Sequence, residues 1–244
     1  MSEVCHKMAK LAALAYLDGK EAKPRMKELG YTGHKFFEKG GAQCHAVWNK
    51  NEYVLAFRGT EPSELSDVLA DLNAIPRGAM THGLVHSGFR GETDKLWNPI
   101  MKHWGGDNGK TKGHQGKKIY ITGHSLGAAM ATIATSRLEE AVKVEQLTTF
   151  GSPRVGTRKF VKHISTPHMR YVNNNDIVTK VPLFIMGYKH HGVLKYINFY
   201  GNVRKLTTWQ MIKDKWRGWK SGILDGAMDH GMANYVKHTE KLND

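Results

Sequence analysis

Apolar and polar positions alternate along this chain in patterns that change from one segment to the next. Between residues 8 and 17, apolar side chains three or four positions apart predict a helix that ends at the Asp18-Gly19 turn. Residues 42–57 alternate with period two on either side of a polar turn at residues 49–51, which predicts a β-hairpin. A further helical stretch is predicted between Phe89 and Trp104.

The second half of the chain alternates between predicted strands and predicted helices. Strands are expected at 118–122, 146–150 and 168–172, and helices at 127–142 and 157–164. Such alternation is typical of parallel strands joined by right-handed crossovers. The pattern predicts an α/β fold with a central, mostly parallel sheet flanked by helices, in one domain that covers residues 1–244.

The charge of the chain favours anionic partners. Among the 244 residues, 36 lysines and arginines stand against 22 acidic residues, a formal net charge of +14. The basic residues are scattered and accompany no nucleic-acid-binding motif, so we expect no specific nucleic acid partner, although charge alone keeps that alternative open. Contact with an anionic lipid surface is a further expectation.

The lack of a visible secretory signal and the small number of cysteines favour a reducing compartment. No apolar run is long enough to span a bilayer, and no secretory signal is visible, so a cytoplasmic location is expected, with export by a route without a cleaved signal as the less favoured alternative. Cys5 and Cys44 are expected to be reduced thiols.

One polar, glycine-rich segment interrupts this regular pattern. Residues 105–116 are compatible with a domain boundary or a nucleotide-binding loop. Because no GxGxxG or GxxxxGK[ST] pattern is present, we favour a surface loop.

The strongest chemical signal is Gly123-His124-Ser125-Leu126-Gly127. It fits GxSxG, follows a predicted strand and opens an alanine-rich predicted helix. Glycines on both sides of a nucleophile let the strand and helix close in while the hydroxyl stays accessible. The start of the helix favours developing negative charge. Ser125 is therefore the candidate nucleophile.

A serine nucleophile needs a base and a carboxylate that orients it, and in this architecture they follow in the order Ser, Asp, His. Asp176 comes just after the predicted strand at 168–172, at the carboxyl end where open-sheet sites form. His230 stands at a loop-to-helix junction. The adjacent His190 and His191 are interpreted as packing or solvated residues, and His238 lies in a charged helix. The predicted triad is Ser125, Asp176 and His230.

Six motifs in the same order make the chain resemble the class 3 lipase family, the fungal and plant triacylglycerol lipases of the α/β-hydrolase superfamily. The similarity runs from about Met8 to Leu242. The motifs are residues 54–60, 85–89, 123–127, 149–156, 173–182 with Asp176, and Asp229-His230 followed by Tyr235. The resemblance implies an α/β-hydrolase fold with a short helical lid.

The resemblance also implies an oxyanion hole and a lid. Thr60, through its backbone N–H and hydroxyl, and the backbone N–H of Leu126 would hold the oxyanion. The lid would cover about residues 61–76, where one predicted helical face carries apolar side chains at Leu65, Val68, Leu69 and Leu72. A surface helix packed permanently on the core is the alternative. Val68 stands where the secreted fungal members carry a lid tryptophan, which argues against strong activation at an oil interface.

A second amphipathic segment carries Trp209, Ile212, Trp216 and Trp219 interleaved with basic residues. It resembles an interfacial helix, but a core-facing stripe is the favoured interpretation. No metal-ligand spacing is apparent and the family uses no catalytic metal, so no cofactor and no metal are expected.

These features predict a serine carboxylic-ester hydrolase, a lipase or esterase, with fatty-acyl esters such as acylglycerols as substrates. The alternatives are a phospholipase A1 acting on anionic membranes and a catalytically silent lipid-binding relative.

Overall fold

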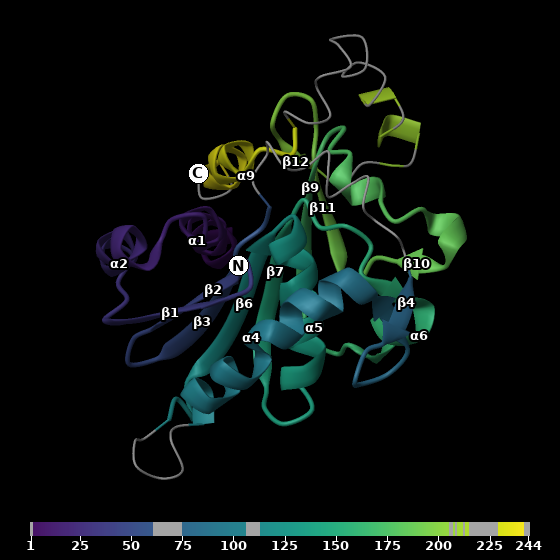
Figure 1. Cartoon of the computed structure of the whole chain (residues 1–244). Helices are drawn as coiled ribbons and strands as arrows, with labels where there is room; N and C mark the ends of the chain where they lie inside the picture. Colours follow the sequence, from purple (N-terminus) through teal and green to yellow (C-terminus); the bar gives the residue numbers. More distant parts are fainter. Residues whose placement is uncertain are drawn as a thin grey trace.

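A mixed sheet of eight strands lies at the centre of the described part of the computed structural model (Figure 1). Its order is β1-β2-β3-β6-β7-β9-β11-β12, with parallel pairing from β3 to β11 and antiparallel pairing at both edges. The strands are β1 (Gly33–Lys39), β2 (Ala42–Trp48), β3 (Glu52–Phe57), β6 (Lys118–His124), β7 (Val144–Phe150), β9 (His168–Asn173), β11 (Val193–Ile197) and β12 (Val203–Arg204). The structure describes residues 2–60, 75–105, 113–204, 207, 209–211, 213–214 and 229–241.

Helices cover both faces of this sheet, as Figure 1 shows. One face packs against α1, α2 and α9, and the opposite face packs against α4 and α5. Because both faces are covered, the central strands are apolar on both sides. The helices are α1 (Ser2–Leu14), α2 (Gly19–Glu28), α4 (Ser87–Gly105), α5 (Leu126–Leu138) and α9 (Met232–Glu240).

Strand β3 shows how the sequence divides between the two cores. Tyr53, Leu55 and Phe57 belong to the core under α4 and α5, whereas Val54 and Ala56 belong to the core under α1 and α9. The side chains of a strand point alternately to its two faces, so an uninterrupted apolar run serves both layers.

A second, smaller sheet lies beside the C-terminal half of the main one. Its strand order is β10-β8-β5-β4, all antiparallel, and helix α6 (Arg158–His163) packs against it. Figure 1 shows α6 next to β4. The strands are β4 (Pro76–Gly78), β5 (Leu84–His86), β8 (Gly156–Thr157) and β10 (Tyr188–Lys189), and two short 3₁₀ helices precede β10, η2 (Val178–Lys180) and η3 (Phe184–Met186).

The predicted α/β architecture is confirmed, with differences in detail. The hairpin of residues 42–57 forms β2 and β3, and the three predicted parallel strands form β6, β7 and β9. The first helix starts at Ser2 rather than at Met8, and α5 ends at Leu138 instead of residue 142. The single domain over residues 1–244 stays a prediction, because several segments lie outside the described residues.

No helix in the described ranges combines the length and the apolar character that a bilayer-spanning helix requires. The cytoplasmic location stays a prediction.

Stability is expected to fall in mild acid because His45 on β2 is fully buried. Burial, and next the nearby His34, lower the pKa of His45 to about 4. The unfolded state therefore binds the proton more readily between about pH 6.5 and pH 4, so the free energy of unfolding drops as the pH falls through this window.

The contribution of His45 can be isolated with His45→Gln. Urea unfolding at a series of pH values is expected to show a slope that is flatter by up to about 1.4 kcal/mol per pH unit in the variant. Equal slopes in the two proteins would contradict this assignment. Circular dichroism at pH 7 controls for correct folding of the variant.

Candidate active site

Ser125 and Asp176 lie at the carboxyl end of the parallel strands, and among the described residues of the predicted triad the hydrogen bonds join Asp176 to His230. Ser125 follows β6, Gly151 follows β7 and Asp176 lies in the loop after β9. His230 comes from a different part of the chain, directly before α9. Ligand sites of open α/β sheets form at this edge.

Ser125 occupies a strained turn between β6 and α5. Its φ of 56° and ψ of −127° place a non-glycine residue at positive φ. A Cβ on Gly123 would lie 2.3 Å from the Gly127 carbonyl oxygen, and one on Gly127 would lie 2.3 Å from the Phe57 carbonyl oxygen. Both positions therefore require glycine, and the turn holds the Ser125 side chain at the start of the helix.

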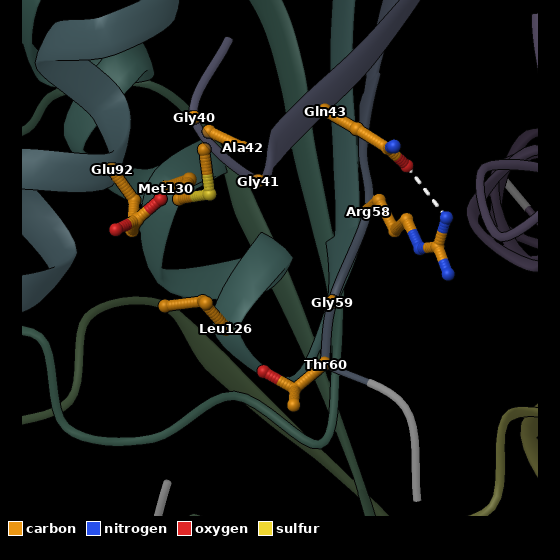
Figure 2. Close-up of a pocket in the computed structure, with 10 residues that line it drawn as sticks. All are labelled: Gly40, Gly41, Ala42, Gln43, Arg58, Gly59, Thr60, Glu92, Leu126 and Met130. Carbon is orange, nitrogen blue, oxygen red and sulfur yellow. Dashed lines mark hydrogen bonds between the residues drawn. The ribbon is translucent and has the colours of Figure 1, made fainter. Parts of the chain in front are cut away.

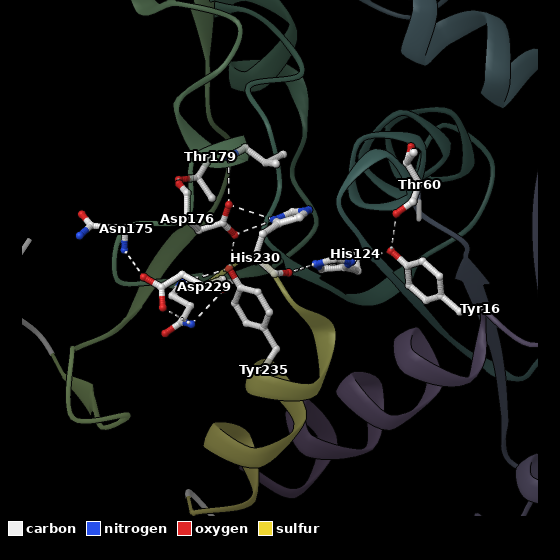
Figure 3. A network of polar contacts seen from close by, with 11 residues as sticks. Tyr16, Thr60, His124, Asn175, Asp176, Thr179, Asp229, His230 and Tyr235 are labelled. Carbon is white, nitrogen blue, oxygen red and sulfur yellow. Dashed lines mark hydrogen bonds and ion pairs between the residues drawn. The ribbon is translucent and has the colours of Figure 1, made fainter. Parts of the chain in front are cut away.

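Asp176 and His230 form a buried pair. The carboxylate is fully buried, and its two oxygens each lie 2.9 Å from His230 Nδ1 (Figure 3). The Val178 N–H donates to Oδ1 at 3.0 Å, and the Tyr235 hydroxyl donates to Oδ2 at 2.5 Å. These donors keep the carboxylate fixed, so it can hold the imidazole with a proton on Nδ1.

The second imidazole nitrogen of His230 is not hydrogen-bonded to any described residue. This nitrogen, Nε2, is buried. The His230 ring lies 4.4 Å, centroid to centroid, from the ring of His124, the residue before Ser125. A base whose Nδ1 is bound to a carboxylate and whose Nε2 is free can accept a proton from a serine hydroxyl.

A chain of hydrogen bonds ties the two loops of this pair together. Asn173 Nδ2 donates to the Asp229 carbonyl oxygen at 2.9 Å, and the Asn175 N–H donates to an Asp229 carboxylate oxygen at 3.0 Å. Asp229 therefore fixes the position of His230 relative to the loop that carries Asp176 (Figure 3).

His124 links the site to the turn that follows α1. Its Nε2 donates to the His230 carbonyl oxygen at 2.7 Å, and its Nδ1 accepts from the Tyr16 hydroxyl at 2.6 Å. Burial, and next the neighbouring His230, lower the pKa of His124 well below its usual range. A neutral ring has one donor and one acceptor nitrogen, which matches these two contacts.

The two predicted oxyanion-hole residues line the same pocket. This cavity of about 370 Å³ is open on one side, and Thr60 and Leu126 stand together at one end of it (Figure 2). A Cβ on Gly59 would lie 3.1 Å from Ser125 Cβ, so the backbone just before Thr60 passes close to Ser125. Leu126 is the first residue of α5, and the first N–H groups of a helix have no partner within it.

The rest of the pocket mixes small, polar and apolar residues. On one wall of the pocket, Arg58 donates a hydrogen bond to Gln43 Oε1 at 2.6 Å (Figure 2). The apolar side chain of Met130 lines the opposite wall. The remaining lining residues are Gly40, Gly41, Ala42, Gly59 and Glu92.

Three sequence-based interpretations lie wholly or partly outside the described residues. Of the predicted lid at about 61–76, residues 61–74 with Leu65, Val68, Leu69 and Leu72 lie outside, and Pro76 begins β4. Of the second amphipathic segment, Trp209 is described and is 64% exposed, and Ile212, Trp216 and Trp219 are not. Of the 105–116 loop, residues 106–112 are not described.

The remaining candidate histidines have packing roles. His190 donates to the Thr179 carbonyl oxygen at 2.9 Å, and His191 pairs with the buried His168. Sequence reasoning missed the positioning contacts of Tyr16, His124 and Tyr235. His124 lies inside the GxSxG motif and Tyr235 follows His230 by five positions, but the motifs alone assign neither of them a role.

Comparison of the sequence with known proteins assigns the chain to a family. The family model for class 3 lipases matches residues 54–186, more than half of the chain. The chain belongs to the class 3 lipase family.

Curated proteins similar to this chain include a toxin, a phospholipase and a lipase. The chain is 36% identical over 120 residues to the toxin TseL of Vibrio cholerae, 32% over 157 residues to phospholipase A(1) DAD1 of Arabidopsis thaliana, and 31% over 158 residues to a lipase of Rhizopus niveus. These stretches cover 47%, 54% and 59% of the chain. They span only 18%, 34% and 38% of the relatives' own lengths.

Solved lipase structures share the fold of this chain. A mutant form of MDLA from Penicillium cyclopium superposes with a TM-score of 0.70 at 23% identity, covering 85% of this chain and 83% of the other. A lipase from Rhizopus microsporus var. chinensis gives a TM-score of 0.66 at 25% identity, covering 80% and 74%. The fold is therefore that of the α/β-hydrolase lipases.

Gly151 is expected to be essential to the geometry of the Asp176–His230 pair. Its φ is +56°, and a Cβ there would lie 2.7 Å from Asp176 Oδ2 and 2.8 Å from His230 Nδ1. Gly151→Ala is therefore expected to lower kcat at least about tenfold as well as stability, since it displaces the base and strains the backbone.

Gly30→Ala is the matched control for this variant. Gly30 has a φ of +88°, and a Cβ added there would meet nothing within 4 Å, so the substitution adds backbone strain without a clash. Kinetics and thermal unfolding of both variants separate the two effects. Unchanged kcat in Gly151→Ala, or an equal loss in Gly30→Ala, would contradict the role of the close contact.

Proposed function

We propose that this chain is a serine carboxylic-ester hydrolase that cleaves fatty-acyl esters, with acylglycerols as the first substrate class to test. The observation that carries the proposal is the buried Asp176–His230 pair beside the strained turn of Ser125, with the Thr60–Leu126 pocket next to it. Lipases and a phospholipase A1 among the relatives support it.

The geometry supports a two-step acyl transfer. The Ser125 hydroxyl oxygen bonds to the ester carbonyl carbon while His230 Nε2 takes the hydroxyl proton, and Asp176 stabilises the imidazolium that forms. The tetrahedral intermediate collapses when the alkoxide leaving group departs and takes that proton from His230. Water then attacks the acyl-enzyme with His230 as base, which releases the fatty acid and restores Ser125.

The negative oxygen of each tetrahedral intermediate needs donors that are already in place. The Leu126 N–H at the start of α5 and the backbone N–H and hydroxyl of Thr60 are the proposed donors, on the pocket side of Ser125. Stabilisation from such fixed donors is large because they need no reorganisation during the reaction.

Thr60→Val tests the hydroxyl of this proposed oxyanion hole. Removing one donor is expected to lower kcat about 100- to 1000-fold with little change in KM, because the donor acts on the intermediate rather than on the bound ester. Thr60→Ser keeps the hydroxyl and is expected to stay within about tenfold of wild type. Equal activity of Thr60→Val and wild type would show that the hydroxyl donates nothing.

The proposed activity is tested with p-nitrophenyl butyrate, octanoate and palmitate, with and without detergent. We expect hydrolysis, and the chain-length profile places the enzyme between esterase and lipase. No hydrolysis of any ester, in buffer or in detergent, would favour the catalytically silent lipid-binding alternative.

A ridge of exposed apolar side chains favours action at a lipid surface. Leu183, Phe184, Ile185 and Met186, at and just before η3, are 53%, 60%, 87% and 51% exposed. Ile177, the residue after Asp176, is 43% exposed in the same loop. We call these five residues the apolar ridge. Consecutive exposed residues of this size are typical of surfaces that contact another apolar phase.

Positive charge flanks the apolar ridge. Lys189 Nζ lies 3.0 Å from the centroid of the Phe184 ring, and Lys180 follows Ile177 by three positions. Apolar side chains next to lysines suit a membrane with anionic headgroups, where each basic residue contributes about 1 kcal/mol. We infer that the apolar ridge docks on anionic lipid next to the active site, which supports a phospholipase A1 activity as the second candidate function.

Vesicle binding tests the docking of the apolar ridge. Ile185→Ser is expected to weaken binding to phosphatidylglycerol vesicles about tenfold while hydrolysis of p-nitrophenyl butyrate in solution is unchanged. Val193→Ser is the control, because Val193 is 54% exposed at the opposite, amino end of the parallel strands. Equal binding of Ile185→Ser and wild type, or no preference for anionic over neutral vesicles, would contradict this docking surface.

A further inference from the structure

Three side chains that commonly bind metals meet beside the smaller sheet, away from the active site. His82 lies in the turn between β4 and β5, Glu140 follows α5, and His163 is the last residue of α6. One ligand atom from each of the three side chains lies within 4.8 Å of the other two. His82 and Glu140 are exposed and His163 is half-buried, so solvent ions reach them.

The contacts converge on a single ring nitrogen. His163 Nε2 lies 3.1 Å from His82 Nδ1 and 2.6 Å from Glu140 Oε1. A ring nitrogen carries either one hydrogen or one lone pair, so hydrogen bonding satisfies one of these two contacts and leaves the other unmatched. The His82 and His163 rings face each other with centroids 3.8 Å apart and planes tilted by 31°. A cation shared by the three atoms satisfies all of them once the two rings turn so that each nitrogen directs its lone pair at the same centre.

We propose that His82, Glu140 and His163 bind a divalent transition metal ion, with Zn²⁺ as the ion that fits the donor set best. Two imidazoles and one carboxylate are usual zinc ligands, with bonds of about 2.0–2.2 Å, and a water molecule would complete a tetrahedron. Two ligand atoms of such a tetrahedron lie roughly 3.3 Å apart, close to the separation of the two histidine nitrogens.

The backbone holds the three segments together without the metal. A Cβ on Gly83 would lie 2.5 Å from the Phe160 nitrogen, so the turn that carries His82 packs directly on α6. The Glu139 carboxylate accepts from the N–H groups of Ser165 and Thr166, which joins the end of α5 to the residues after His163. The three segments are therefore preorganised, and a bound ion would clip the β4–β5 turn to α5 and α6.

The first test measures Co²⁺ and Zn²⁺ binding by the metal-free chain. We expect one Co²⁺ per chain with the visible absorption of a tetrahedral site, displaced by Zn²⁺. His82→Gln and His163→Gln are each expected to weaken Zn²⁺ binding at least about tenfold. The control is His34→Gln, which disrupts another histidine pair, with His45, that lacks a carboxylate.

Thermal unfolding supplies a second readout. Zn²⁺ at about 100 times the wild-type Kd is expected to raise Tm by roughly 5–10 °C in wild type and in His34→Gln, and by at most about half as much in His82→Gln. His82 is exposed in a turn, so its variant is expected to fold, which circular dichroism checks. Absence of stoichiometric binding in wild type, equal affinity in His82→Gln and His163→Gln, or loss in His34→Gln would overturn the proposal.

Discussion

Ser125→Ala is expected to lower kcat for ester hydrolysis by about 10⁵- to 10⁶-fold. Ser125 holds the only side chain at the strained turn between β6 and α5 that can form the acyl bond, and no neighbouring hydroxyl occupies the same position in the described structure. Without the oxygen, the imidazole of His230 has no proton to accept. Steady-state kinetics with p-nitrophenyl butyrate measures the loss.

Ser136→Ala is the matched control for this loss. Ser136 is also a fully buried serine on the same helix, and its hydroxyl donates to the Ile133 carbonyl oxygen rather than to the site. Its activity is expected to stay within about threefold of wild type. Residual activity of Ser125→Ala above one-hundredth of wild type would contradict Ser125 as the nucleophile.

Asp176→Asn is expected to lower kcat by about 10⁴-fold while the fold is retained. The Val178 N–H and the Tyr235 hydroxyl both donate to the carboxylate of Asp176. The amide oxygen of asparagine would keep the bond from Val178, so its NH₂ group would face His230 Nδ1. That nitrogen would then accept a hydrogen bond, and Nε2 would carry the proton and lose its capacity as a base.

A buried aspartate that has no imidazole partner among the described residues controls for the loss of a carboxylate. Asp214 accepts hydrogen bonds from the Tyr196 hydroxyl and the Phe199 N–H. Asp214→Asn is expected to change stability and to leave kcat within about threefold. If Asp176→Asn kept more than a tenth of wild-type kcat with normal thermal unfolding, Asp176 would not be the residue that orients His230.

Sequence patterns predicted the central part of the fold well because its strands and helices have strong local signals. The strand at 118–122, the GxSxG turn and the alanine-rich helix were placed within a few residues of β6 and α5. Strand β1 was missed because its burial is mixed, and β11 because two of its five residues, Val193 and Leu194, are exposed although apolar. Strands β1 and β11 are stabilised by pairing with neighbouring strands, and this pairing leaves no pattern in the local sequence.

The candidate triad could be chosen from the sequence because chain order and position after a strand leave few residues. The contacts that support the triad could not be predicted from the sequence. His124 joins Tyr16, 108 positions earlier, to His230, 106 positions later, and Gly151 packs on Asp176 and His230 from another strand. These contacts depend on the three-dimensional arrangement of β6, β7 and α9.

The proposed metal site was beyond sequence reasoning for the same reason. No metal-ligand spacing is visible in the sequence, and no metal was expected. The three ligands of the site are 58 and 23 positions apart, and the packing of the β4–β5 turn on α6 brings them together. Residues 61–74 lie outside the described structure, so the predicted lid stays a prediction.

Covalent labelling with a fluorophosphonate, followed by mass spectrometry of the peptides, tests the proposed chemistry most directly, because the reagent bonds to an activated serine. A Ser-His-Asp hydrolase with Ser125 as nucleophile predicts one label per chain, located on Ser125, and labelling at least about 100-fold slower in His230→Ala. Labelling of a different serine would contradict Ser125 as the nucleophile. So would the absence of label on Ser125 of the folded protein, in buffer and in detergent.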